Sequence, residues 1–596
     1  MQMYLDRIEV LGEHAGSAPF IGAPFTGTTT TVGPLVVTHE EIDREGRSRW
    51  SVANRGDRPL SLGAVRQIWR LTGGETGVER PLRMFRNGYQ SWSPTGVATL
   101  GVDVDPSTVG PSAGRRVPRL VRATHHADEA IAEPGELRSE AVTVLRAGND
   151  RPVLVGFVGG STHDGTLRLR DTDAGPELAV EAFLGGAVLA AGAERVLHDV
   201  FVDAGASADD PHAVAGVLER WAAIVGRAER ARTAAPFQVG WCSWYHYFGG
   251  VTEADLRSNL ARADDWPFDL FQLDDGYQTA IGDWLGTNDT FASPLDELAG
   301  TIAAAGRRPG LWLAPFLAAP GSQVAREHPG WVARYVDGER PLVGMWHPVW
   351  GGAVHTLDTS NPEVLAHLTS VTAEVVAAGF TYLKLDFTYA PAAEGVYADG
   401  SRTPAERVRA GYDAVRAGAG DGAFLLGCGA PLGAVVGVVE GMRIGPDVAP
   451  HWNPEHANPA LAGYEGGEPA TVNAWRCTLA RSFMHRHLWL NDPDCLMLRT
   501  RRTRLTADKV RAWSLAVGVS GGMALVSDDL ALLDGDARRL LDEVIELGRR
   551  SDAAAGDGAP ARCGDLLDHA VPHRLAAAGV ELRADPSDGV ATLTPN

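Results

Sequence analysis

Short apolar runs recur along the middle of the chain, and stretches with helical periodicity separate most of them. Strand-like runs that alternate with helical ones are typical of an α/β fold with a parallel sheet. Eight such runs lie between residues 237 and 533, at 238–242, 269–273, 310–314, 382–385, 423–427, 442–445, 487–490 and 523–527. The pattern predicts a (β/α)8 TIM barrel at 237–533, with one large insertion between its third and fourth strands.

The chain on either side of this region has a different pattern. In residues 1–206, short strand-like runs are separated by glycine, asparagine, aspartate and proline, which predicts an N-terminal β-sandwich with a long loop near 100–120. Residues 207–236 have helical periodicity and predict a helical linker. Residues 534–596 are expected to hold a final helix at 537–547, a linker and a small C-terminal β module with strands near 580–583 and 590–594.

Composition excludes several classes of protein. The chain is 44% hydrophobic and 22% charged, as globular proteins are, and its net charge of -21 argues against a nucleic-acid partner. Five cysteines without CxxC spacing indicate neither a disulfide framework nor a zinc site. No basic and apolar leader and no apolar run of membrane-spanning length occurs, so we expect a cytoplasmic protein that does not enter membranes.

Carboxylates follow five of the eight predicted strands: Asp274, Asp275, Asp386, Asp447, Asp492, Asp494, Asp528 and Asp529. Aspartate also caps helices and turns, so any one of them alone has a structural explanation. Together they predict an active site, because a TIM barrel carries its catalytic groups at the C-terminal ends of its strands. Lys384 and Asp386 are two residues apart and share one face of their strand, so the lysine would keep the carboxylate ionised.

Three chemistries could use such a ring of carboxylates: a Mg²⁺ site, proton abstraction beside a metal, and glycoside hydrolysis by two carboxyl groups. Aromatic residues near the strand ends favour a sugar, whose ring has apolar faces: Trp241, Trp244, Tyr245, Tyr247, Trp312, Trp346, Trp350 and Trp452. The segment 86–94 combines an Asn87-Gly88 turn with Trp92. It is either a packed hairpin or a loop that reaches the barrel mouth.

Six motifs in this order resemble glycoside hydrolase family 36, which holds α-galactosidases (melibiases) and raffinose synthases: Gly-Trp-Cys-Ser-Trp at 240–244, Leu-Asp-Asp-Gly at 273–276, Lys-Leu-Asp at 384–386, Arg-Ile-Gly-Pro-Asp at 443–447, Asn-Asp-Pro-Asp at 491–494 and Ser-Asp-Asp-Leu at 527–530. The resemblance implies a retaining mechanism with Asp386 as nucleophile and Asp447 as general acid and base. It also implies that the substrate contacts Asp274, Asp275, Lys384, Arg443, Trp241, Cys428, Gly429 and Trp312, and that no metal or organic cofactor is needed.

The resemblance implies a retaining exo-α-glycosidase acting on an α-linked oligosaccharide or glycoside, most simply an α-galactosidase. The chain departs from the family pattern at 387–389 and 427–433, so α-N-acetylgalactosaminidase, α-glucosidase and raffinose-synthase-like transferase activities stay open. A sugar-binding barrel without turnover and a Mg²⁺-dependent enzyme are the alternatives from other classes. By analogy with the family, a homo-oligomer is a further expectation.

Overall fold

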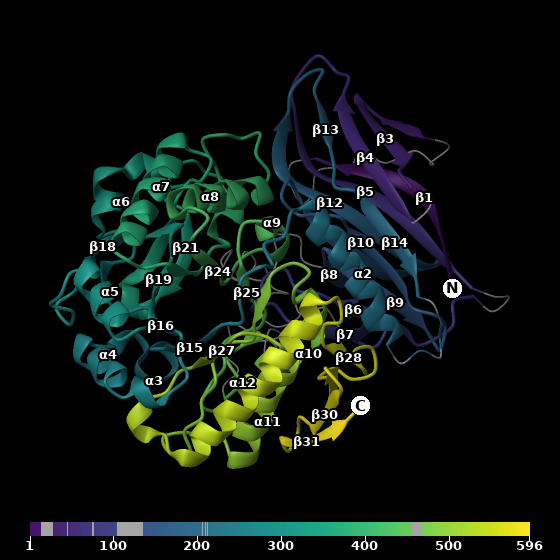
Figure 1. Ribbon diagram of the computed structural model, residues 1–596. Coiled ribbons are helices and arrows are strands. Elements are labelled where there is room, and N and C mark those ends of the chain that lie inside the picture. The colour runs from purple at the N-terminus through teal and green to yellow at the C-terminus, as the bar shows by residue number, and fades with distance from the viewer. Residues whose placement is uncertain are drawn as a thin grey trace.

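The computed structural model describes residues 1–12, 28–43, 46–73, 77–103, 135–205, 207–208, 210, 212–455 and 467–596. Figure 1 shows a β-rich N-terminal part beside a barrel of strands and helices, with a small C-terminal sheet next to α10 and α11. Most of the long loop expected at 100–120 lies outside the described residues, as does residue 206, where the first domain boundary was placed. The bounds of the four predicted domains therefore stay predictions.

Two antiparallel sheets form the N-terminal part. One has the order β1-β5-β12-β11-β8, and the other has the order β2-β3-β4-β14-β10-β9-β6-β7 with β13 beside β4. Alternate apolar side chains of both sheets, including Val37, Leu145 and Leu178, are buried in one cluster. The strands are β1 Gln2–Leu11, β2 Thr29–Val32, β3 Leu35–Glu41, β4 Arg47–Asn54, β5 Leu60–Thr72, β6 Leu82–Arg86, β7 Gly96–Thr99, β8 Leu137–Glu140, β9 Val142–Ala147, β10 Val153–Phe157, β11 Asp164–Thr172, β12 Gly175–Leu189, β13 Glu194–Val196 and β14 Val200–Ala204.

Eight parallel strands form the barrel, in the order β26-β25-β24-β23-β19-β16-β15-β27. They are β15 Val239–Cys242, β16 Leu270–Leu273, β19 Arg308–Leu313, β23 Tyr382–Leu385, β24 Phe424–Gly427, β25 Gly441–Arg443, β26 Leu490–Asp492 and β27 Ala524–Val526. The two end strands approach each other through single contacts, such as the hydrogen bond from Met523 N to Asn491 O at 2.9 Å. The predicted fold class, a TIM barrel with β-rich parts at both ends, is confirmed.

The seventh barrel strand was placed too early. We expected it at 487–490, but the strand begins at Leu490 and the preceding residues form a turn. Arg486 has a φ of 61°, and His487 N donates to Met484 O at 3.2 Å, which closes that turn. Leu488 and Trp489 are buried in the turn, so the apolar run that suggested a strand reflects burial instead.

Helices cover the outside of the barrel and link it to the sandwich (Figure 1). Trp221 of α2 donates its indole N–H to Phe157 O of β10 at 2.9 Å, which fixes this helix on the sandwich. The helices are α2 Ala213–Ala228, α3 Trp244–Tyr247, α4 Glu253–Leu260, α5 Leu295–Ala304, α6 Gln323–Glu327, α7 Pro362–Ala377, α8 Pro404–Ala419, α9 Leu432–Val435, α10 Thr471–Ala480, α11 Ala507–Ser520 and α12 Gly535–Gly556. The last helix is longer than the expected 537–547, because the alanine-rich segment read as a linker continues it.

The expected insertion lies between β19 and β23. It contains a three-stranded sheet in the order β20-β22-β21, formed by β20 Leu317–Ala318, β21 Val343–His347 and β22 Gly352–Thr356. A hairpin-like strand pair, β17 Gln278–Ala280 and β18 Asp283–Thr287, follows β16. Both additions extend from the C-terminal ends of barrel strands, so they contribute to the rim around the barrel mouth.

The expected C-terminal β module is present as a four-stranded antiparallel sheet. Its strands are β28 Arg562–Cys563, β29 Arg574–Ala577, β30 Val580–Asp585 and β31 Val590–Pro595. Two buried indoles of the barrel part hold it, since Trp475 donates to Pro572 O at 2.8 Å and Trp452 donates to Pro586 O at 2.5 Å. Among the described residues, no helix combines the length and the apolar character needed to cross a membrane.

Candidate active site

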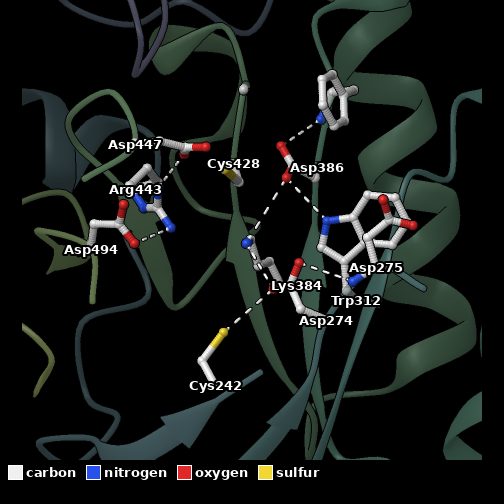
Figure 2. Close-up of polar contacts among 12 residues, drawn as sticks. Cys242, Asp274, Asp275, Trp312, Lys384, Asp386, Cys428, Arg443, Asp447 and Asp494 are labelled. Atoms are coloured by element: carbon white, nitrogen blue, oxygen red, sulfur yellow. Dashed lines mark hydrogen bonds and ion pairs between the residues drawn. The ribbon is translucent and has the colours of Figure 1, made fainter. Parts of the chain in front are cut away.

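Lys384 lies at the centre of the polar cluster in the barrel mouth (Figure 2). Its ammonium group is 2.9 Å from Asp274 Oδ2 and 4.0 Å from Asp386 Oδ2, and all three side chains are buried. Burial alone would lower the pKa of Lys384, but the two carboxylates overcome this effect and hold it well above its usual value. The lysine is therefore a fixed cation between two carboxylates that come from different strands.

Asp386 follows β23 directly and points into this cluster. Its Oδ2 accepts a hydrogen bond from Trp312 Nε1 at 3.0 Å, and its Oδ1 accepts one from Phe387 N at 2.8 Å. Phe387 has a φ of 53°, a left-handed turn that directs its own N–H back to the carboxylate. Burial raises the pKa of Asp386, while Lys384 and the Trp312 donor oppose that rise. A carboxylate held in place by donors and a cation can act as a nucleophile.

Asp274 and Asp275 follow β16 and differ in their surroundings. Asp274 is tied to Lys384 and also accepts a hydrogen bond from Gln272 Nε2 at 2.6 Å. Asp275 has no cation beside it among its recorded partners, and its oxygens accept from Gln278 Nε2 at 2.6 Å and Trp350 Nε1 at 3.0 Å. Burial raises the pKa of Asp275 to about 6. Both carboxylates are acceptors of the kind that bind sugar hydroxyls.

Arg443 organises the opposite side of the mouth. Its guanidinium contacts three carboxylates, Asp447 at 3.1 Å, Asp492 at 3.1 Å and Asp494 at 2.8 Å. The side chain of Asp447 is 34% exposed, against 10% for Asp386, so Asp447 is the member of the pair that can exchange protons with solvent. Asp494 also accepts from Tyr245, and burial raises its pKa to about 7. Asp492 and Asp494 thus hold Arg443 in place.

The N-terminal sandwich reaches into the same mouth. Its segment after β6 brings Trp92 to 5.1 Å from the ring of Phe387 and 6.0 Å from that of Tyr389. Ser91 Oγ accepts a hydrogen bond from Gly429 N at 3.1 Å. Gly429 has a φ of 55°, and a Cβ there would lie 3.1 Å from the Trp92 ring, so glycine permits this close approach. Segment 86–94 agrees with both interpretations, because it connects the paired strands β6 and β7 as a hairpin and also reaches the barrel mouth.

Arg481 fixes that loop, although no sequence pattern indicates this role. The guanidinium is fully buried and donates to Asn87 Oδ1 and to the backbone oxygens of Gly88, Gln90, Ser91 and Ile444 at 2.7–3.3 Å. All five acceptors are neutral, and burial lowers the pKa of Arg481 to about 10. An arginine that binds turn carbonyls of a remote segment leaves no motif in the sequence.

Aromatic rings line the rest of the cluster. Trp350, at the end of the 3-10 turn η6 (Pro348–Trp350), lies 6.0 Å from the Trp312 ring and 5.0 Å from the Phe387 ring. Trp350 is one of the aromatic residues near strand ends, but the sequence motifs do not place it in the site. Cys428 is buried, and burial together with the nearby Asp386 carboxylate raises the pKa of its thiol well above the usual value.

The structure does not bring Trp241 to the site. Its ring stacks on Phe271 at 4.7 Å, its indole donates to Asp528 O at 2.8 Å, and its side chain has no exposed surface. Successive side chains of a strand point to opposite sides, so the next residue, Cys242, faces the cluster and contacts Asp274 Oδ2 at 3.6 Å. The expectation that Trp241 lines the sugar site is corrected accordingly.

The two aspartates after the last barrel strand have structural roles. Asp528 is buried, pairs with Arg499 at 2.5 Å and accepts the backbone N–H groups of Leu498 and Arg499. Asp529 accepts from Ala531 N at 3.0 Å and caps a short 3-10 turn. Aspartate commonly accepts backbone N–H groups in this way after a strand. The candidate site therefore includes no carboxylate that follows β27.

The barrel region matches a known family, and the fold has close counterparts among solved structures. The model of the melibiase family matches residues 237–406. TtGalA, an α-galactosidase from Thermus thermophilus solved in complex with p-nitrophenyl α-D-galactopyranoside, superposes with a TM-score of 0.69. Its sequence is 27% identical, and the alignment covers 93% of this chain and 97% of that one. In its barrel region the chain is thus similar to the melibiase family, and its fold is similar to that of glycoside hydrolase family 36 α-galactosidases.

Two curated relatives of this chain match over shorter segments. The α-galactosidase AgaA of Geobacillus stearothermophilus is 29% identical over 137 residues, 22% of this chain and 18% of that protein. α-Galactosidase 2 of Pediococcus pentosaceus is 28% identical over 152 residues, 24% of this chain and 20% of that protein. The matched segments span about a fifth of the length of these curated relatives.

Proposed function

We propose that this protein is a retaining exo-α-galactosidase with Asp386 as nucleophile and Asp447 as general acid and base. The observation that carries the proposal is the contrast between the two carboxyl groups. Asp386 is buried and held by a cation and fixed donors, whereas Asp447 pairs with Arg443 and is one-third exposed. A retaining glycosidase needs a positioned nucleophile and a second carboxyl group that can give and take a proton.

The proposed reaction has two steps. Asp386 attacks the anomeric carbon, the bond to the leaving oxygen breaks, and protonated Asp447 gives its proton to that oxygen. The resulting glycosyl ester on Asp386 is then attacked by water, from which Asp447 takes a proton, and the ester bond breaks to restore the nucleophile. Lys384 supports both steps, because its charge keeps Asp386 ionised before attack and stabilises the carboxylate as it leaves.

The surrounding groups suit a terminal sugar ring. Asp274 and Asp275 would accept hydrogen bonds from its hydroxyl groups, and Lys384 and Arg443 would donate to them. Aromatic faces of Trp92, Trp312 and Trp350 and the Cys428–Gly429 turn would bound the apolar faces of the ring. We propose an α-linked galactoside or galacto-oligosaccharide as substrate, since the relatives are α-galactosidases and TtGalA is described with stachyose as well as with the nitrophenyl galactoside.

No cofactor takes part in the proposed reaction. Most carboxylates of the mouth already have cationic partners, since Lys384 lies beside Asp274 and Asp386 and Arg443 contacts the carboxylates on the other side, which suits sugar binding better than a divalent cation. A cytoplasmic location and a homo-oligomeric state stay predictions. Sedimentation velocity of the purified protein would test the second.

The proposal is tested with a panel of p-nitrophenyl α-glycosides of galactose, N-acetylgalactosamine, glucose and arabinopyranose. Wild type, Asp386→Ala and the control variant Asp529→Ala are assayed together; the control removes a strand-end carboxylate that only caps a turn. We expect turnover of the α-galactoside in wild type and control, loss in Asp386→Ala, and rescue of that variant by azide with formation of β-galactosyl azide.

The other outcomes separate the alternatives. Turnover of another sugar only would keep the mechanism and make the protein an α-N-acetylgalactosaminidase or α-glucosidase. Transfer of galactose to a sugar acceptor in preference to water would identify a raffinose-synthase-like transferase. Binding of galactose by wild type without turnover of any glycoside would overturn the proposal in favour of a sugar-binding barrel.

A further inference from the structure

Three potential metal ligands lie at four-residue intervals between β28 and β29: Asp565, His569 and His573. One carboxylate oxygen and one ring nitrogen from each histidine all lie within 4.8 Å of one another. Within residues 1–455 and 467–596, as far as the structure describes them, no other three His, Cys, Asp or Glu side chains form such a group. None of the three residues belongs to the barrel mouth.

Backbone contacts hold the three side chains in this arrangement. Asp565 is buried, and its carboxylate accepts His573 N at 2.9 Å and Arg574 N at 3.3 Å. Its backbone oxygen accepts His569 N at 3.3 Å, so both histidines are anchored to the same aspartate through the main chain. The imidazole rings lie face to face, with centroids 4.2 Å apart and planes 15° from parallel.

The segment that carries the group is fixed to the other two parts of the molecule. Asp568 pairs with Arg146 and lies 3.8 Å from Arg83, and both arginines belong to the sandwich. Pro572 O accepts the indole N–H of Trp475, in α10 of the barrel. The three ligands therefore stand where the C-terminal sheet meets both the sandwich and the barrel (Figure 1).

We propose that Asp565, His569 and His573 bind a single divalent transition-metal cation, with Zn²⁺ as the best match. Imidazole nitrogens and a carboxylate oxygen are zinc ligands, and three such ligands leave a fourth tetrahedral position for water. Ligand atoms at about 2.0–2.1 Å from zinc are about 3.4 Å apart in a tetrahedron. The three candidate ligand atoms lie within 4.8 Å of one another, so the shorter spacing around zinc requires the histidine side chains to rotate. His569 can rotate because it is exposed.

The proposed ion has a structural role and is independent of the proposed glycosidase function. It would cross-link the segment between β28 and β29, which is otherwise held by the buried side chains of Leu566 and Leu567, by hydrogen bonds and by partly exposed ion pairs. A ligand that binds the folded state and not the unfolded chain stabilises the fold. Zinc should therefore raise the melting temperature and slow amide exchange in residues 562–577, and EDTA should leave the turnover of α-galactosides unchanged.

The test uses full-length protein without a histidine tag, stripped with EDTA and dialysed. Isothermal titration with ZnCl₂ should give one site per chain, and Co²⁺ should give the visible absorption of a tetrahedral complex. His569→Ala should weaken binding at least about 100-fold, since even the residues that only support a ligand account for 10–100-fold in affinity. His451→Ala is the matched control, because it removes a histidine outside the three-residue group, one that has a single carboxylate nearby among the described residues, Glu455 at 3.9 Å.

Each possible result of these measurements either supports or overturns the proposed metal site. Removal of the exposed ring of His569 leaves the buried contacts of Asp565 intact, so this variant should fold, and circular dichroism would verify it. Zinc binding and a zinc-dependent rise in melting temperature that occur in wild type and His451→Ala but not in His569→Ala support the site. Absence of binding, or equal binding by the two variants, overturns it.

Discussion

Replacement of Lys384 by methionine tests the electrostatic part of the proposed mechanism. Methionine keeps a long apolar side chain but removes the charge that lies 4.0 Å from Asp386 and 2.9 Å from Asp274. Gln272 and the N–H of Asp275 still donate to Asp274 in the variant, so this carboxylate keeps part of its stabilisation. Asp386 loses its nearest cation, and its protonation should therefore change most.

The size of the effect follows from Coulomb's law. Two unit charges 4.0 Å apart interact by about 4 kcal/mol at an effective dielectric constant of 20 and by about 1 kcal/mol in water. Since 1.36 kcal/mol corresponds to one pKa unit, removal of the cation should move the titration upward by between roughly one and three pH units. Asp386 must be ionised to attack the sugar, so activity should be lost at a higher pH than in wild type as the solution is acidified.

The measurement is kcat/KM for p-nitrophenyl α-galactoside as a function of pH, because this ratio reports ionisations in the free enzyme. The acid limb of Lys384→Met should lie above that of wild type by the stated amount, and its maximum should also fall because a hydroxyl contact is lost. Lys384→Arg keeps the charge and should have an acid limb close to that of wild type. Coincident acid limbs for wild type and Lys384→Met would refute the electrostatic role.

Three further predictions concern the loop and the thiols. Arg481→Met removes the guanidinium that donates to five buried oxygens and should lower the free energy of unfolding by at least about 3 kcal/mol in urea titrations; an unchanged midpoint would contradict this role of Arg481. Trp92→Ala should raise KM for the nitrophenyl galactoside about tenfold and change kcat less, whereas an unchanged KM would place the ring outside the site. All five cysteines are buried, so Ellman's reagent should react with none of them before urea unfolds the protein.

Much of the barrel could be predicted, because the apolar runs and the carboxylates that follow them indicate the same strand ends. Seven of the eight expected strands overlap an observed one at nearly the expected position, and the carboxylates of Asp274, Asp275, Asp386 and Asp447 gather at one end of the barrel. Parallel strands present their C-terminal ends to the same side, so the order of strands along the chain already places these groups together.

The errors have physical causes that sequence patterns do not contain. Trp241 and Cys242 are neighbours on one strand, and a shift by one residue exchanges the face that points into the barrel. The buried turn before β26 is as apolar as a strand, so hydrophobicity alone could not separate the two. Arg481 could not be recognised, because its partners are backbone oxygens of a segment that only the tertiary fold brings near.

The contact between Arg481 and the loop of the sandwich also bears on how the protein is made. Asn87 and Arg481 are 394 residues apart in the chain. At a synthesis rate of 5–20 residues per second, the loop is complete roughly 20 to 80 seconds before its arginine exists. During that interval the nascent sandwich can form its own sheets, but Trp92 has no barrel to face. The sugar site is therefore assembled late on the ribosome, after nearly the whole barrel has been synthesised, and a refolding chain should regain its strands before it regains activity.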